Sequence, residues 1–270
     1  MTRKFIFLDV DGTILDTKKA VPESAKTAIT QARKLGHKVF LCTGRSRVEI
    51  PESLWTIGFD GLVGSAGAYV EAGGQMLSHT PLPEEKVLRA SRYLEGIGAL
   101  FVLEGNDYIY ANKESAAYQR NRFQGASREV IECYVDCVRE YETIEELKGI
   151  NKILFLTSPV SVEEIKEELK DCLTVIPSTF SFNEGISGEI YSTVRNKAVG
   201  IEEIVAHFGG DMKDTIGFGD GDNDYEMLEE VNVGVAMGNG TEKLKALADF
   251  VTNHVDEDGL YYGFVHTGLL

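Results

Sequence analysis

The chain has 270 residues, and 43% of them are hydrophobic, which suffices for one large globular domain or two ordinary ones. Its formal net charge of −16 argues against a nucleic-acid partner, because such partners are bound largely by lysine and arginine side chains that neutralise phosphates. No apolar run approaches the ~20 residues that span a bilayer, and no basic region with an apolar signal core opens the chain, so we expect a cytoplasmic protein without a membrane partner.

Strands and helices alternate in the first third of the chain. The expected elements are a strand over 4–8, an amphipathic helix over 22–35, a strand over 38–42, a short strand after Gly61, and a hairpin over 68–82 that turns at Gly73-Gly74. Such alternation is typical of a parallel α/β sheet.

The pattern changes after Pro83 and becomes a mixture of helices and strands. We expect a helix to about Gly96, strands around Phe101 and Tyr108, helices around Ala117 and Val138, a strand over 152–156, an acidic helix over 162–170, and strands near Val175 and Ile190. The middle third is therefore predicted to be an α+β insert.

Alternation resumes at Asn196 and continues through the last third. The expected elements are a helix over 197–208, a strand over 214–218, a helix over 225–230, a strand over 233–235 and a helix over 242–248. The first and last thirds thus resemble one domain that the middle third interrupts. We expect this domain over 1–81 and 190–270, and the insert over 82–189.

Three of the expected strands end in polar residues suited to chemistry. These strand ends are Asp9-Val10-Asp11, Thr43-Gly44-Arg45 and Asp220-Gly221-Asp222-Asn223-Asp224. Ligands of a parallel α/β sheet bind outside the carboxyl ends of its strands. If these strands are neighbours in the sheet, the two acidic groups lie close together. Their negative charges would then repel each other strongly unless a cation is bound between them. A competing interpretation is that Asp9 and Asp11 are solvated residues of an Asp-Gly hairpin turn.

The residue types indicate a hard cation, because carboxylates are present without a histidine or thiol cluster. The chain has four cysteines with no CxxC pair, so we expect them to be reduced structural thiols. Calcium is disfavoured because an EF-hand loop counted from Asp220 has Tyr225 and Val231 where glycine and glutamate are needed. Magnesium is the expected metal.

Other residues offer donors for a phosphate group. Thr43 has a hydroxyl, Gly44 has an unhindered N–H, and Lys197 opens a predicted helix with a positive charge. Each also has an ordinary explanation, a strand-end turn or a solvated lysine, and only their joint occurrence favours phosphate. No Walker loop and no GxGxxG follows the first strand, so a nucleotide is not indicated.

Four of these segments together resemble the haloacid dehalogenase superfamily of phosphotransferases. The motifs are DVDGT at Asp9, TGR at Thr43, the helix-opening Lys197 and GDGDND at Gly219, and they occur in the family's order. The insert and the DEDG at 256–259 resemble its Cof-type subgroup with a type IIB cap. The resemblance implies a Rossmann-like, three-layer α/β core with a parallel sheet and an inserted α+β cap over 82–189 that governs substrate specificity.

The resemblance also implies a role for each matching residue. Asp9 is the expected nucleophile and Asp11 the expected acid/base, which face one phosphate because residues two apart in a strand point the same way. Mg²⁺ is expected at Asp9, the Asp11 carbonyl and Asp220, supported by Asp224. The phosphate is expected at Val10 N–H, Thr43, Gly44, Lys197 and Asn223. Two positions depart from the family pattern: Ala198 follows Lys197, and Ala66-Gly67-Ala68 replaces Asn-Gly-Ala.

The expected activity is magnesium-dependent hydrolysis of small phosphorylated metabolites, with sugar phosphates as the leading class and an aspartyl phosphate as the intermediate. A phosphomutase of the same superfamily is the nearest alternative, since it would use the same Asp9. A phospho-receiver signalling module is a third, although it needs neither Asp11 nor a large insert.

Overall fold

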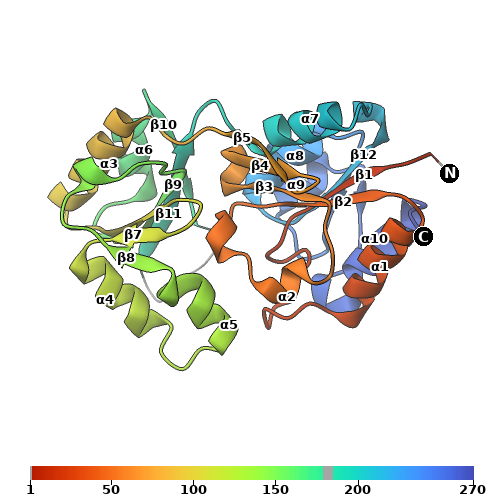
Figure 1. Cartoon of the computed structure of the whole chain (residues 1–270), viewed down its shortest axis with the longest axis horizontal. Coiled ribbons are helices and arrows are strands. Elements are labelled where there is room, and N and C mark those ends of the chain that lie inside the picture. The colour runs from red at the N-terminus through yellow and green to blue at the C-terminus, as the bar shows by residue number, and fades with distance from the viewer. Residues whose placement is uncertain (1, 179–184) are drawn as a thin grey trace. The chain divides into compact units, whose positions relative to one another are not determined.

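A computed structural model of the chain describes residues 2–178 and 185–270 (Figure 1). These residues form two units, each with its own sheet. Unit 1 comprises Met1–Gly44, Glu52–His79 and Asn196–Leu270, and unit 2 comprises Arg45–Pro51 and Thr80–Arg195. Within the described residues, no helix combines the length and the apolar composition needed to cross a membrane.

Unit 1 is built on an eight-stranded sheet in the order β14-β13-β12-β1-β2-β3-β4-β5. Its strands are β1 (Phe5–Leu8), β2 (Lys38–Cys42), β3 (Gly61–Gly64), β4 (Tyr69–Ala72), β5 (Gln75–His79), β12 (Thr215–Gly219), β13 (Val233–Ala236) and β14 (Phe250–Val251). Its helices are α1 (Glu23–Lys34), α2 (Glu52–Trp55), α7 (Lys197–His207), α8 (Tyr225–Glu230), α9 (Glu242–Leu247) and α10 (Gly259–His266). The first six strands of the sheet order pair in parallel, whereas β4 and β5 form an antiparallel hairpin.

Helices cover both faces of this sheet and make three layers (Figure 1). Phe7 and Phe40 stack with ring centroids 5.1 Å apart on the face that Ile204 of α7 covers. On the opposite face, Phe218 of β12 packs against Phe264 of α10 at 5.1 Å. The central strands are buried on both faces, so their sequences are continuous apolar runs. These runs are the pattern from which the strands were predicted.

Unit 2 has a six-stranded sheet in the order β10-β11-β9-β6-β7-β8, antiparallel except for the pair β7/β8. Its strands are β6 (Leu100–Glu104), β7 (Ile109–Ala111), β8 (Val138–Glu140), β9 (Lys152–Ser158), β10 (Leu173–Pro177) and β11 (Ile186–Ser192). Its helices are α3 (Glu84–Gly96), α4 (Lys113–Arg122), α5 (Arg128–Ile131) and α6 (Val162–Leu169). Phe101 and Phe155 belong to the core that includes Ile165 of α6, whereas Val102 belongs to a second core with Ala116 of α4.

One expected element is wrong, and α2, β14 and α10 are among the elements that were not predicted. The segment around Val138 is a strand and not a helix: α5 and the π-helical turn Glu132–Asp136 end just before it, and Val138 pairs in parallel with Ile109. Its β-branched side chain suits a strand. Strand β14 is only two residues long and α10 follows an irregular turn, so neither shows a clear periodic signal. The four cysteines are free and buried, as expected.

Candidate active site

The sheet of unit 1 brings the three polar strand ends to one edge. β1 lies between β12 and β2, and the register places Leu8 beside both Phe218 and Leu41. Asp9 directly follows β1, and its N–H donates a hydrogen bond of 2.9 Å to the Phe218 carbonyl. The residues that follow these strands therefore lie at the carboxyl edge, where parallel sheets bind ligands.

Lys197 places a buried positive charge at this edge. It opens α7, whose N-terminus is capped by the Asn196 side chain, which accepts a hydrogen bond of 3.1 Å from Val199 N–H. The Lys197 ammonium donates to Asp9 Oδ1 at 2.7 Å and to Asp224 Oδ1, and Lys197 is 1% exposed. Burial alone would lower the pKa of Lys197, but the two carboxylates raise it, so the side chain is charged.

Asp224 and Asp220 complete the arrangement from the loop after β12. Asp224 is fully buried, and its Oδ2 accepts the N–H groups of Asp220 and Gly221, each at 3.0 Å. A side chain at Gly219 would meet Asp224 at 2.5 Å, so glycine is needed there. We call Asp9, Asp220 and Asp224 the acidic cluster, because one carboxylate oxygen of each lies within 4.8 Å of the others.

The acidic cluster carries more negative charge than Lys197 can balance. Burial and the nearby Asp224 raise the pKa of Asp9 well above its ordinary value, and the same two causes raise the pKa of Asp220 to about 7. Three carboxylates facing one ammonium favour a further cation, and an all-oxygen donor set suits a hard divalent metal. The residues present therefore fit a divalent cation such as magnesium.

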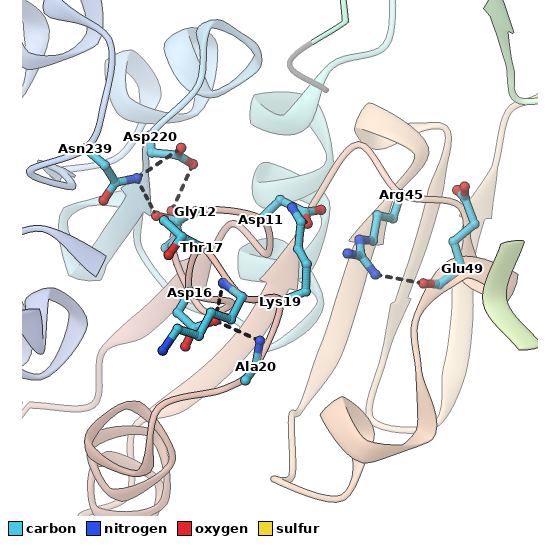
Figure 2. A network of polar contacts seen from close by, with 12 residues as sticks. Asp11, Gly12, Asp16, Thr17, Lys19, Ala20, Arg45, Glu49, Asp220 and Asn239 are labelled. Carbon is cyan, nitrogen blue, oxygen red and sulfur yellow. Dashed lines mark hydrogen bonds and ion pairs between the residues drawn. The ribbon is translucent and has the colours of Figure 1, made fainter. Parts of the chain in front are cut away.

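Asp11 lies two residues after Asp9. It directly precedes a turn over residues 12–20, which we call the flap. Gly12 has a φ of +78°, and a side chain there would meet Asp220 Oδ2 at 2.3 Å. Only glycine lets the flap pass this close to the acidic cluster. The Asp11 carboxylate lies 3.0 Å from the ammonium of Lys19, which belongs to the same flap (Figure 2). Val10, between the two carboxylates, is completely buried.

Three further residues that are expected to bind phosphate follow β2 and β12. Thr43 follows β2 and is 2% exposed, its N–H donating to the Val63 carbonyl at 2.8 Å. Gly44 follows Thr43 and is half-buried, and Asn223 is half-buried in the turn Asp222–Asp224. Thr43 and Gly44 thus follow the strand next to β1, and Asn223 directly precedes Asp224.

The segment that departs from the family pattern packs against the start of α7. Ala66 adopts a left-handed conformation with a φ of 52°, and Gly67 follows with a φ of 94°. A side chain at Gly67 would lie 2.0 Å from the Asn196 carbonyl. This glycine therefore lets the loop approach the residue that caps the helix of Lys197.

Asn239 also contacts the acidic cluster and was not predicted from the sequence. Its amide nitrogen lies 2.8 Å from the Gly12 carbonyl and 3.3 Å from Asp220 Oδ2 (Figure 2). Asn239 follows β13, the parallel neighbour of β12. The rule that polar residues at strand ends form the site would have included it if the rule had been applied to this fourth strand.

Comparison with known proteins adds to this geometry. A family model described as haloacid dehalogenase-like hydrolase matches residues 6–264. The Bacillus subtilis protein named "Putative phosphatase YkrA" is 30% identical over 272 residues, which cover 100% of each chain. Among solved structures, the HAD subclass IIB sugar phosphatase BT4131 has a TM-score of 0.80 and 26% identity over 99% of this chain and 100% of its own. A structure described as showing a conserved trigonal-bipyramidal intermediate in a phosphoryl-transfer superfamily has a TM-score of 0.84 and 26% identity over 100% of each chain.

Proposed function

Because the chain belongs to the haloacid dehalogenase-like hydrolases and is a phosphatase of that superfamily, we propose that it hydrolyses phosphate monoesters of small metabolites through a phosphorylated Asp9. Sugar phosphates are the proposed substrate class, and the similarity to a sugar phosphatase supports this choice. The observation that carries the proposal is the Asp9 carboxylate, buried at a strand end and held by Lys197 at 2.7 Å beside two further carboxylates.

The proposed reaction has two steps, both at the carboxyl edge of the unit 1 sheet. In the first, an Asp9 oxygen bonds to phosphorus, the ester P–O bond breaks, and Asp11 gives its proton to the leaving oxygen. In the second, Asp11 takes a proton from water, the water oxygen bonds to phosphorus, and the Asp9–phosphorus bond breaks to release inorganic phosphate. Asp9 and Asp11 are thereby restored.

The phosphate needs positive charge and hydrogen-bond donors in a protein whose net charge is −16. We assign Lys197, Thr43, Asn223 and the N–H groups of Val10 and Gly44 to hold its oxygens. We assign Asp9, the Asp11 carbonyl, Asp220 and Asp224 to hold Mg²⁺. When bound, this ion would neutralise negative charge that develops on the transferred group.

We further propose that unit 2 selects the substrate while unit 1 carries the chemistry. All assigned catalytic, metal-binding and phosphate-binding residues belong to unit 1. An insert of the size of unit 2, with its own sheet and core, offers surface for contacts with the part of the substrate that does not react. Such remote contacts raise specificity without taking part in bond breaking.

The test is a panel of phosphorylated metabolites assayed for phosphate release with magnesium and with excess chelator. We expect release with magnesium, at least one preferred sugar phosphate, and loss of release with chelator. Full release in chelator would contradict the metal assignment. Release that requires a bisphosphate activator, with the phosphoryl group returned to the sugar, would indicate a phosphomutase instead.

A further inference from the structure

The segment after β13 contacts the flap through two residues that have no role in the proposed reaction. Asn239 makes the first contact and Asp256, in the turn Val255–Glu257, makes the second. We call these two residues the C-terminal bracket. Both contacts lie within unit 1, so the bracket joins the end of the chain to the loop that begins at the acid/base residue.

Asn239 uses both ends of its amide. Its nitrogen donates to the Gly12 carbonyl at 2.8 Å and lies 3.3 Å from Asp220 Oδ2, while its oxygen accepts the Val255 N–H at 2.9 Å. Gly12 directly follows Asp11, so a bond to its carbonyl fixes the Gly12–Thr13 peptide, one residue beyond the acid/base residue. The same nitrogen orients a carboxylate that we assign to the metal. An amide is suited to this position because it combines two donor hydrogens with an acceptor.

Asp256 holds the far side of the flap. Its two carboxylate oxygens accept the Thr17 N–H at 3.1 Å and the Thr17 hydroxyl at 2.8 Å. These bonds lower the pKa of Asp256, so the carboxylate is ionised when it holds Thr17. Thr17 is exposed, and the bonds therefore tie the exposed end of the flap, residues 17–20, to the body of unit 1.

Asp16 closes the turn of the flap that contains Thr17, through backbone hydrogen bonds with Lys19 and Ala20 and through its side chain. Asp16 Oδ1 accepts the N–H groups of Lys18 and Ala20, each at 2.8 Å (Figure 2). This turn brings Lys19, with a φ of 61°, into the left-handed region and its ammonium to 3.0 Å from Asp11. Thr17 lies inside the turn, so a bond at Thr17 restrains the position of the whole turn.

We propose that Asn239 and Asp256 are positioning residues for phosphoryl transfer: together they hold the flap, and with it Asp11, in register with Asp220. This inference rests on the proposed function. Asn239 contacts both the flap and Asp220, the proposed metal ligand, whereas Asp256 contacts only the flap. Outer residues that orient metal ligands typically change metal affinity or activity by about 10–100-fold when they are removed.

The first arm of the test compares Asn239→Ala with Asn253→Ala, a matched control that removes an exposed amide from the same segment. We expect Asn239→Ala to lower kcat about tenfold with KM within about twofold, and to weaken Mn²⁺ binding, measured directly by electron paramagnetic resonance, by about tenfold. The control should leave all three values near those of the parent. Melting temperatures are recorded for both, since a merely structural role would lower stability without separating kcat from KM.

The second arm concerns the flap, with hydrogen exchange measured in the metal-free protein and kcat measured with magnesium. Asp256→Ala should speed hydrogen exchange of the amides of residues 16–20 about tenfold and lower kcat several-fold without changing Mn²⁺ affinity. Asp256→Asn should restore both values, because an amide can accept from Thr17 N–H and donate to its hydroxyl. Thr17→Val combined with Asp256→Ala should add little to Asp256→Ala alone.

The outcomes separate the two proposals. If the parent releases no phosphate, or if Asp9→Asn releases as much as the parent, the proposed function is wrong, while Mn²⁺ binding and hydrogen exchange still report on the bracket. If the parent is active but Asn239→Ala and Asp256→Ala both match Asn253→Ala in kcat, Mn²⁺ affinity and exchange, the bracket inference is wrong.

Discussion

Each unit of the protein contains a lysine buried among carboxylates, but the two clusters differ in where the sheet places them. Lys197 in unit 1 is 1% exposed and contacts Asp9 and Asp224, whereas Lys152 in unit 2 is 4% exposed and lies 3.2 Å from Glu104 and 3.1 Å from Glu189. We call the second group the Lys152 cluster. Burial alone would lower the pKa of Lys152, but the two glutamates raise it, as the aspartates do for Lys197.

The difference lies in the backbone that carries the charges. Glu104 and Lys152 face each other across two antiparallel strands, and Glu189 lies on the next strand. The members of the acidic cluster instead follow the ends of the parallel strands β1 and β12, where the chain turns. Lys152 has a glutamate on the strand at each side of its own strand, so its charge is satisfied within the sheet. The ends of parallel strands, in contrast, are where such sheets bind ligands. Each cluster holds a buried lysine between two carboxylates, and the cluster that we propose to be catalytic differs in its place at the strand ends and in its third carboxylate, Asp220.

Asp9→Asn should produce the largest effect and tests the comparison most directly. The amide has the shape of the carboxylate but cannot attack phosphorus, so we expect kcat to fall by about 10³-fold or more. Glu104→Gln is the matched change in the Lys152 cluster and should leave turnover of a small aryl phosphate within about twofold. Phosphate release and thermal melting are measured for both. An equal loss of turnover in the two variants would contradict the assignment of the chemistry to the acidic cluster alone.

Asp11→Asn should have the next largest effect, because it removes the proposed acid/base but leaves the nucleophile. General acid–base catalysis contributes about 10²–10⁴-fold, so we expect a kcat loss of that order with a poor leaving group and less with an activated aryl phosphate. Rapid quenching should detect phosphorylated protein with the activated substrate. A loss that does not depend on the leaving group would contradict the role of Asp11.

Lys152→Met should act on stability and not on chemistry. The change leaves Glu104 and Glu189 buried without their cation, and breaking a buried pair in this way costs about 3–5 kcal/mol. Burial and the nearby Glu49 already raise the pKa of Glu104, so part of the loss is relieved by protonation. Urea unfolding followed for unit 2 measures the cost. Turnover per folded molecule should stay near that of the parent, and a kcat collapse in the fully folded variant would assign chemistry to this cluster.

The smallest expected effect concerns pH and metal. The pKa of Asp220 is raised to about 7 from an ordinary value of 3.8, so the metal-free folded state holds a proton that the unfolded chain has lost. Stability in chelator should therefore fall as pH rises from about 4 to about 7. Magnesium needs the ionised carboxylates, so its stabilisation should grow over the same interval, by a few degrees in Tm. Asp220→Asn should flatten this trend, and an unchanged trend would contradict the assignment.

The sequence predicted the parallel sheet well because its strands are apolar runs that end abruptly in polar residues, as at Leu8-Asp9 and Cys42-Thr43. It could not predict the Lys152 cluster. Charged residues in strands usually face solvent, and only the pairing register of Glu104 with Lys152 places them in contact. Asn239 was missed because a Gly-Asn-Gly sequence is typical of an ordinary turn. The catalytic roles assigned to Asp9 and Asp11 stay predictions.

The insertion of unit 2 between His79 and Asn196 also has a consequence for biosynthesis. Lys197, the partner of Asp9, is synthesised 188 residues after it, and β12, which completes the pairing of β1, follows Lys197. At typical synthesis rates of about 5–20 residues per second, roughly 10–40 seconds pass between the synthesis of β1 and that of these partners. Most of unit 2 is translated in this interval, so an entire second unit separates the synthesis of neighbouring strands of the unit 1 sheet.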